Sequence, residues 1–186
     1  VLYCVWRDIT DRKQAEEEAY QLAFFDPLTG LPNRRLLRDR LQQSMAASAR
    51  SGKYRALLYL DLDHFKNLND THGHAMGDRL LIEMAQRLRT CVREGDTVAR
   101  LGGDEFVLLV QQLDEDLETA VAQAGRIGDK VVAQLSQPCA IGAVQYQGSA
   151  SVGVSMFLGH ALGIDEILKR ADLAMYQAKA AGRNTV

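Results

Sequence analysis

The chain has 186 residues, of which 47% are hydrophobic and 25% charged, a composition that is ordinary for one soluble domain and excludes wholesale disorder. Its 22 Lys and Arg residues and 24 Asp and Glu residues leave a net charge of -2, which argues against binding nucleic acid through a broad basic face. Three widely spaced cysteines (Cys4, Cys91 and Cys139) form neither a disulfide framework nor a zinc motif, and no apolar run approaches the roughly 20 residues of a bilayer-spanning helix. We therefore expect a cytoplasmic piece of a longer protein, without direct membrane contact of its own.

The first elements are predicted to be a connector. Residues 1–7 are typical of the end of a strand from an upstream domain, and a charged helix is expected from residue 8. Ala15, Ala19 and Leu22 lie four and then three residues apart on this helix, which indicates a thin apolar seam. The seam suits a short coiled coil, and a solvated linker helix explains it equally well.

The remaining pattern predicts an α+β domain. Turn-forming residues at 26–33 end the connector, and a helix begins at about Arg34. The elements expected after it are a buried strand over 54–62, a helix over 78–92, strands over 97–101 and 106–111, a helix over 115–136, strands over 139–146 and 148–157, and a helix over 165–181. This core order is that of the ferredoxin-like βαββαβ fold, an antiparallel sheet with helices on one face.

Acidic residues mark a possible metal site. Asp61 and Asp63 lie two residues apart at the end of the first core strand, and Asp104 and Glu105 lie in the glycine turn of the later hairpin. In a ferredoxin-like sheet these two places are neighbours, and converging carboxylates repel one another unless a cation lies between them. Hard oxygen ligands favour Mg²⁺, which also takes phosphate oxygens and serves phosphoryl chemistry. The alternative is a set of exposed strand-end acids beside an ordinary turn.

Other polar residues suggest a nucleotide. Lys66, Lys179 and Arg183 could hold phosphates, although cations at a helix C-terminus are also favoured by the helix dipole alone. An Asp accepts hydrogen bonds from both N1–H and N2–H of guanine, which makes Asp78, together with Asn69, a candidate for base recognition. Asp78 could also serve as the N-cap of the helix that follows it.

The sequence Gly-Gly-Asp-Glu-Phe at 102–106 resembles the motif of the GGDEF diguanylate cyclase family. Further blocks of the family are matched in order by the residues at 26–34, 61–70, 73–78 and 179–184. The resemblance implies a nucleotidyl-cyclase type of α/β sandwich over residues 24–186. Residues 8–13 resemble the exit of a PAS sensor domain, so that 1–23 would hold the end of that domain and a signalling helix.

The resemblance also implies roles for individual residues. The family condenses two GTP molecules into cyclic di-GMP and two pyrophosphates, with Mg²⁺, or alternatively Mn²⁺, at two ions per active site. The metal would be held by Asp61, the backbone carbonyl of Leu62, and Asp104. Glu105 would deprotonate or orient the attacking 3′-hydroxyl, while Gly102 and Gly103 would let the backbone approach the nucleotide. Guanine would be read by Asn69 and Asp78, and the phosphates held by Lys66, Lys179, Arg183 and the amides near His64 and Phe65.

Two implications concern assembly and regulation. Each protomer would bind one GTP, so catalysis would need a homodimer whose geometry the connector helix could set. The residues Arg93 and Asp96 match an R-x-x-D product-inhibition site of the family, at which Arg100 could assist.

Two other functions are retained as alternatives. One is a catalytically silent GTP-binding module that controls a downstream EAL-type cyclic di-GMP phosphodiesterase domain. The other is a different nucleotidyl transferase, such as an adenylyl cyclase or a polymerase palm, which a guanine-reading Asp78 and the slight negative charge disfavour.

Overall fold

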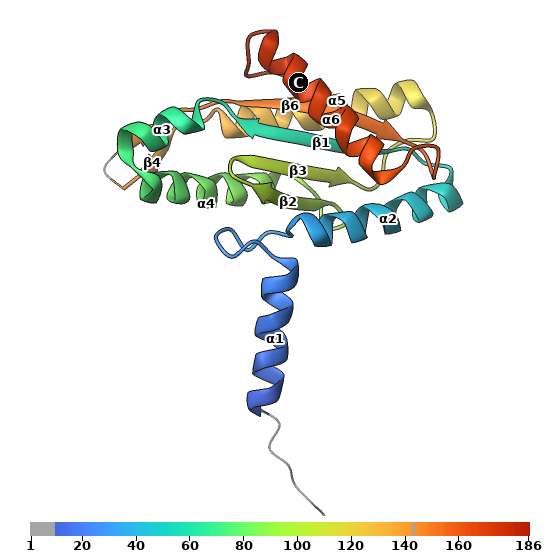
Figure 1. The fold of residues 1–186 in the computed structure, drawn as a ribbon. Helices are drawn as coiled ribbons and strands as arrows, with labels where there is room; N and C mark the ends of the chain where they lie inside the picture. Colours follow the sequence, from blue (N-terminus) through green and yellow to red (C-terminus); the bar gives the residue numbers. More distant parts are fainter. Residues whose placement is uncertain (1–9, 143) are drawn as a thin grey trace, which may run out of the picture.

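A four-stranded antiparallel sheet forms the centre of the domain in a computed structural model, which describes residues 10–142 and 144–186 (Figure 1). The strand end expected at residues 1–7, which was assigned to a PAS domain, lies outside the described residues. The helices are α1 (Thr10–Phe24), α2 (Arg34–Ser51), α3 (Phe65–His72), α4 (His74–Cys91), α5 (Leu117–Leu135) and α6 (Ile164–Ala180). The strands are β1 (Arg55–Leu62), β2 (Thr97–Gly102), β3 (Glu105–Val110), β4 (Cys139–Ile141), β5 (Val144–Tyr146) and β6 (Ala150–Phe157).

The order of strands in the sheet confirms the ferredoxin-like prediction. The four strands lie in the order β2-β3-β1-β6, so that β1 pairs with the hairpin on one side and with β6 on the other. The first core strand is thus interior, which explains why residues 55–60 are all buried. The pairing also carries the end of β1 to the start of β3, where the acidic residues are.

Helices cover both faces of the sheet, which corrects the expectation of helices on one face. Leu58 and Leu60 belong to a core cluster shared with α4 and α5, whereas Leu57 and Tyr59 belong to a second cluster shared with α2 and α6. Alternate residues of β1 point to opposite faces, and here both sets are apolar. The uninterrupted apolar run of this strand already contained the signal for two covered faces.

Two further expectations require correction. The predicted helix over 78–92 begins earlier, at His74, and is preceded by the separate helix α3, with Gly73 at the junction. Asp78 is consequently the fifth residue of α4 and not its N-cap. The predicted strand over 139–146 is divided into β4 and β5, which pair with each other as a separate two-stranded sheet.

The connector helix leads into a tight turn that is fastened to the domain. In Figure 1, α1 projects from the sheet and its covering helices. Its last residue, Phe24, lies under the guanidinium of Arg35 at 4.7 Å from the ring centroid. Asn33 caps α2 by accepting from the backbone N–H groups of Arg35 and Leu36, and its amide donates to the carbonyl of Ala23. The end of α1 and the start of α2 therefore share one capping residue.

Candidate active site

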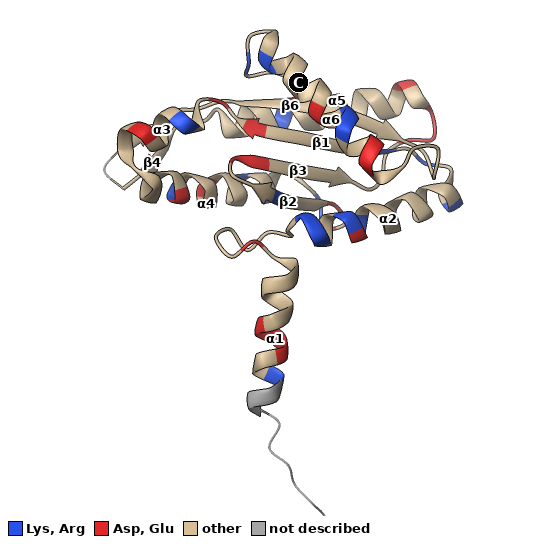
Figure 2. Cartoon of the chain, in the orientation of Figure 1, with Lys and Arg blue, Asp and Glu red and all other residues tan. Residues whose placement is uncertain are grey.

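The acidic residues of β1 and β3 lie next to one another on two adjacent, paired strands. Asp61 is the direct cross-strand partner of Glu105, and Asp104 immediately precedes Glu105 in the hairpin turn. Figure 2 shows acidic residues at the end of β1 and at the start of β3. Side chains directly opposite in an antiparallel pair lie about 5 Å apart at Cβ, and like charges there repel. Burial and the neighbouring charges of Asp61 and Glu105 raise the pKa of Asp104. These carboxylates therefore form a site that favours a positive partner.

The turn between β2 and β3 needs its two glycines for backbone conformation. Gly102 and Gly103 have φ values of 144° and 51°, and a Cβ at either position would meet no atom within 4 Å. The requirement is therefore for positive φ, which glycine adopts without the penalty of other residues. The resulting turn places Asp104 beside the end of β1.

A cavity of about 210 Å³ lies at these acids and collects the predicted phosphate ligands. Its lining includes Asp61, Leu62, Asp104, His64, Phe65, Lys66, Lys179 and Arg183, together with Asp63. The Nζ of Lys179 lies 2.6 Å from Oδ1 of Asp61. His64 and Phe65 stand at the N-terminus of α3, where backbone N–H groups have no acceptor within the helix. Acidic and cationic groups thus adjoin in one cavity, as a metal–triphosphate complex requires.

The donor set fits a hard divalent cation that keeps water or substrate oxygens as ligands. Asp61 and Asp104 offer carboxylates, and Leu62 offers a backbone carbonyl at the same cavity. Among the described residues, no group of three or more His, Cys, Asp or Glu side chains is placed to hold a metal. A small number of protein carboxylates completed by substrate phosphates is the usual arrangement for Mg²⁺.

Asp63 differs from Asp61 although both line the cavity. Asp63 is 2% exposed and its carboxylate accepts hydrogen bonds from the hydroxyls of Ser149 and Ser151. Asp61, by contrast, forms its ion pair with Lys179. The sequence alone placed both acids on one strand face, but β1 ends at Leu62 and Asp63 lies beyond it.

The two proposed base-reading residues come from α3 and α4. The side-chain oxygen of Asn69 is buried and has no hydrogen-bond partner in the described part of the chain. A Cβ at Gly77 would come within 2.0 Å of that oxygen, so only glycine leaves room for Asn69. Asp78, the next residue, is exposed. An unpaired buried acceptor points to a ligand that donates to it.

Sequence reasoning missed Tyr59 as part of this site. Tyr59 lies two residues before Asp61 on the same face of β1 and is 7% exposed. Burial, together with the charge of Glu105 and a hydrogen bond to it, raises the pKa of Tyr59. The phenol therefore stays protonated and donates to the Glu105 carboxylate. Its two-residue spacing from Asp61 was the available signal.

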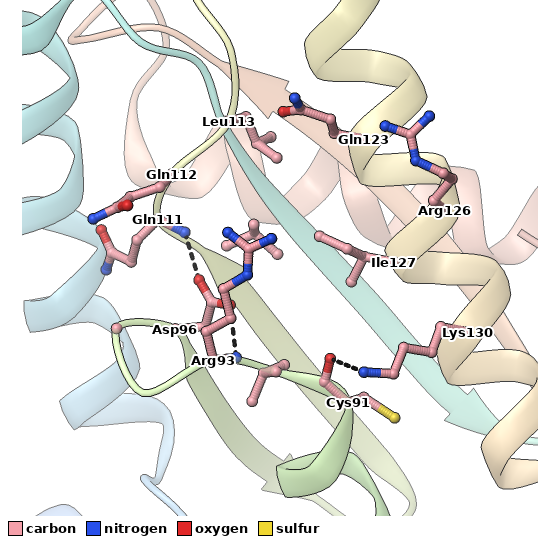
Figure 3. A pocket seen from close by; sticks show the side chains of 13 residues that line it. Cys91, Arg93, Asp96, Gln111, Gln112, Leu113, Gln123, Arg126, Ile127 and Lys130 are labelled. Atoms are coloured by element: carbon pink, nitrogen blue, oxygen red, sulfur yellow. Dashed lines mark hydrogen bonds between the residues drawn. The ribbon is translucent and has the colours of Figure 1, made fainter.

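The predicted inhibitory residues line a different and larger cavity of about 510 Å³ (Figure 3). Arg93 and Asp96 both line it, and Asp96 accepts from the backbone N–H groups of Arg93 (3.1 Å) and Gln111 (2.9 Å). Arg126 and Lys130 of α5 face the same cavity and were not predicted. Their spacing of four residues on one helix face could have revealed them.

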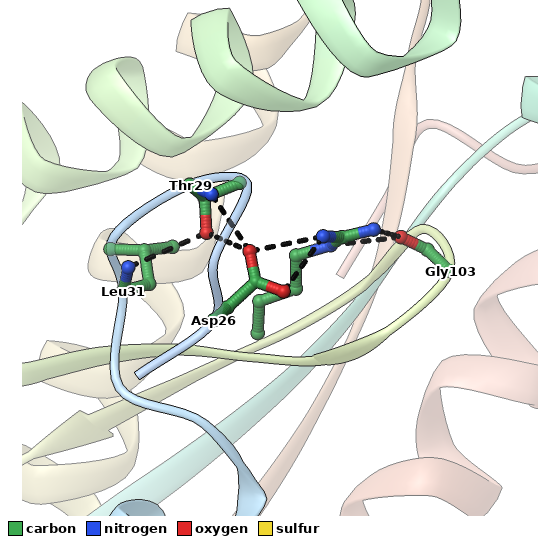
Figure 4. A network of polar contacts seen from close by, with 5 residues as sticks. Asp26, Thr29, Leu31 and Gly103 are labelled. Carbon is green, nitrogen blue, oxygen red and sulfur yellow. Dashed lines mark hydrogen bonds and ion pairs between the residues drawn. The ribbon is translucent and has the colours of Figure 1, made fainter. Parts of the chain in front are cut away.

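Arg100 is placed elsewhere, contrary to the expectation that it assists Arg93 and Asp96. Its guanidinium pairs with Asp26 at 2.9 Å and also donates to the carbonyl of Gly103 (Figure 4). Asp26 further accepts from the backbone N–H and the hydroxyl of Thr29. Although burial opposes it, the hydrogen bonds from Thr29 and Arg100 lower the pKa of Asp26. The network joins the turn after α1 to the turn between β2 and β3.

Comparisons with known proteins identify a family and related folds. Residues 23–185 match the family model described as diguanylate cyclase, GGDEF domain. The bifunctional diguanylate cyclase/cyclic di-GMP phosphodiesterase MucR of Pseudomonas aeruginosa is 45% identical over 94% of this chain and 25% of its own length. These curated relatives extend well beyond the chain, which spans 20% to 43% of their lengths.

Solved structures show the same fold. The GGDEF domain of TpbB (YfiN) from Pseudomonas aeruginosa has a TM-score of 0.80 and 37% identity, covering 87% of this chain and 91% of that one. The coiled coil and GGDEF domain of DgcB from Caulobacter crescentus, in complex with c-di-GMP, has a TM-score of 0.79 and 26% identity, covering 96% and 92%. Within the described residues, no helix is both long and apolar enough to cross a membrane.

Proposed function

Because the chain belongs to the GGDEF diguanylate cyclase domain family, we propose that it condenses two GTP molecules into cyclic di-GMP and two pyrophosphates. In each of two steps, the 3′-hydroxyl of one guanosine attacks the α-phosphorus of the other nucleotide. The bond to pyrophosphate breaks, and the hydroxyl proton passes to a base. The observation that carries the proposal is the pairing of Asp61 with Glu105 beside Asp104, in a site that also holds Lys179.

Family members use divalent metal ions, and we propose Mg²⁺, at two ions per site with Mn²⁺ as a substitute. Asp61, the carbonyl of Leu62 and Asp104 would hold it, and the bound metal would neutralise phosphate charge and lower the pKa of the attacking hydroxyl. Glu105, which neighbours Tyr59, would orient that hydroxyl or take its proton. The phosphates would be bound by Lys66, Lys179 and Arg183, with the amides of His64 and Phe65 at the N-terminus of α3.

Each protomer would supply one GTP, so turnover requires two domains whose sites face each other. We propose that α1, as the end of an upstream PAS signalling segment, sets the relative orientation of the two domains. The decisive assay incubates the protein with GTP and Mg²⁺ and separates the products by chromatography at several protein concentrations. Cyclic di-GMP should appear, with a rate per protomer that rises with protein concentration. Bound GTP without product, at concentrations where the protein is dimeric, would contradict the proposal.

We expect Asp78→Ala to raise the KM for GTP by about 30-fold, because a charge-assisted pair of hydrogen bonds to guanine contributes roughly 2 kcal/mol. The base preference should relax at the same time, since adenine lacks the N1–H and N2–H donors. Steady-state kinetics with GTP, ITP and ATP measure both effects. Asp129→Asn on α5, away from the residues assigned to the nucleotide, is the matched control and should behave as the parent. Equal turnover of ATP by the parent protein would support another nucleotidyl transferase instead.

Product inhibition is proposed at the larger cavity, where Arg93 would clamp a phosphate or guanine of cyclic di-GMP and Asp96 would accept from the base. We expect Arg93→Ala to raise the inhibition constant of cyclic di-GMP at least tenfold, since an ion pair to phosphate is lost. Initial rates measured before product accumulates should stay near those of the parent. Arg170→Ala removes an exposed arginine of α6 that pairs with Glu166, and serves as control. Unchanged inhibition in Arg93→Ala would remove the regulatory assignment.

A catalytically silent GTP-binding role is the second candidate. The relative MucR is named as a bifunctional diguanylate cyclase and cyclic di-GMP phosphodiesterase, and the matched segment is a quarter of its length. In that case this domain would control an EAL-type phosphodiesterase domain further along the parent chain. The assay above separates the two functions, since the silent module binds GTP and yields no cyclic di-GMP.

A further inference from the structure

Two neighbouring residues after α6 adopt an unusual backbone conformation. Arg183 and Asn184 have φ values of 65° and 50°, in the left-handed region, which Arg disfavours and which Asn adopts less readily than glycine. Such a conformation persists only where the surrounding structure imposes it. Arg183 also lines the cavity of the acids, so this turn determines where its guanidinium lies.

The buried carboxylate of Asp63 contacts both residues of this turn. Its Oδ2 accepts from the backbone N–H of Asn184 at 3.2 Å and from the hydroxyl of Ser149 at 2.6 Å. Its Oδ1 accepts from the hydroxyl of Ser151 at 2.8 Å and lies 4.0 Å from Nε of Arg183. One side chain thereby ties the end of β1 to the start of β6 and to the turn after α6.

Two further hydrogen bonds, at Asn184 and Thr185, hold the same turn. The side-chain oxygen of Asn184 accepts from the hydroxyl of Ser136, at 2.6 Å. The carbonyl of Thr185 accepts from the backbone N–H of Val152, at 2.9 Å. The turn is therefore fixed between α5, β6 and the carboxylate of Asp63.

The bonding of Asp63 distinguishes it from a metal ligand. Its two oxygens receive three O–H or N–H donors, and the cationic Nε of Arg183 lies 4.0 Å from Oδ1, so little acceptor capacity is left for a metal ion. We propose that Asp63 is a positioning residue, which locks the turn at Arg183 and Asn184 so that Arg183 meets the triphosphate, and that it does not bind the divalent metal. This inference rests on the proposed function for the identity of the nucleotide.

The first test compares Asp63→Asn with Asp61→Asn by titrating Mn²⁺ without nucleotide and recording its electron paramagnetic resonance signal. Asp63→Asn should keep the Mn²⁺ affinity of the parent within about twofold, whereas Asp61→Asn should lose at least tenfold. A loss in Asp63→Asn equal to that in Asp61→Asn would overturn the inference. The measurement needs no turnover, so it stands even if the protein makes no cyclic di-GMP.

The second test is a double-mutant cycle on GTP binding, with Asp63→Asn, Arg183→Ala and the double variant. Each single variant should weaken GTP about tenfold, and the double variant should be little worse than Arg183→Ala, because Asp63 acts through Arg183. Losses that multiply in the double variant would contradict the inference. Failure of the parent to bind GTP would instead count against the proposed function.

Two milder variants keep the inference testable if Asp63→Asn does not fold. Ser151→Ala removes one donor to Asp63 and should weaken GTP without changing Mn²⁺ affinity. Asn184→Gly adopts the left-handed backbone readily and keeps its N–H donor, so it should bind GTP within about threefold of the parent, whereas Asn184→Ala should bind more weakly. Equal affinities for the glycine and alanine variants would overturn the role of the strained turn.

Discussion

Asp104→Asn should lower the production of cyclic di-GMP by about a thousandfold or more and at the same time raise the melting temperature. The catalytic loss follows because the metal supplies several kcal/mol of stabilisation to the transition state, and a carboxamide holds it poorly. The gain in stability follows because the pKa of Asp104 is raised by burial and by Asp61, so its charge opposes folding at neutral pH. Removing one like charge from a paired site contributes about 0.5 kcal/mol, or about 2 °C. Product chromatography and thermal unfolding without metal measure the two effects.

The sign of the pH dependence provides an internal check. The folded-state pKa of Asp104 lies above the ordinary value of 3.8, so its contribution to stability is fully present below that value and is lost as the pH rises through the folded-state pKa. The difference in melting temperature between Asp104→Asn and the parent should therefore vanish in acid and appear as the pH rises. Asp165→Asn, in an exposed ion pair with Arg38, is the control, and its melting temperature should stay close to that of the parent at every pH. A melting temperature of Asp104→Asn below that of the parent at pH 7 would refute the electrostatic account.

Asp26→Ala should destabilise the domain by about 3 kcal/mol, because it leaves the guanidinium of Arg100 without its carboxylate in a poorly exposed place. The side chains of Arg100 and Asp26 are only 10% and 15% exposed, so water replaces the pair inefficiently. For a chain of this length the melting temperature should fall by about 10 °C. Turnover should fall as well, since Arg100 also holds the carbonyl of Gly103 in the turn that places Asp104. Denaturant unfolding and initial rates measure both losses.

Glu166→Ala is the control that distinguishes the loss of the Asp26–Arg100 pair from the loss of any single carboxylate. Glu166→Ala breaks an exposed pair with Arg170 and should leave the melting temperature close to that of the parent. The stabilising effect of the Asp26 pair should disappear in strong acid, since the pKa of Asp26 is lowered and the carboxylate becomes protonated only as the pH falls through that value. If Asp26→Ala unfolds with a free energy within 1 kcal/mol of the parent, Arg100 does not depend on this carboxylate.

Several features were readable from the sequence for local reasons. The apolar run over 56–60 is typical of a buried strand, and Gly102 and Gly103 permit a turn that other residues resist. The family motif at 102–106 and the aspartate at 61 lie in positions that any ferredoxin-like pairing brings together. The fold class and the meeting of the acids were therefore predictable.

Other features depend on contacts between residues far apart along the chain. Asp61 and Asp63 look alike in sequence, yet the hydroxyls of Ser149 and Ser151 surround only the second of them. Arg100 was assigned by proximity in sequence to Arg93 and Asp96, whereas its partner Asp26 is 74 residues away. No local pattern distinguishes a charge that binds a ligand from one that is neutralised within the fold.

By itself, the sequence determined the order of the elements, the turn at the two glycines and the kinds of side chain that can hold a metal and a triphosphate, because these depend on periodicity and on chemistry carried by each residue. Only the packed chain shows that Asp61 pairs with Lys179 at the cavity while Asp63 is buried among hydroxyl donors, and that Arg126 and Lys130 face the second cavity. The physical reason is that burial and hydrogen-bond partners are properties of the packed chain, set by strand register and helix docking rather than by neighbours in sequence.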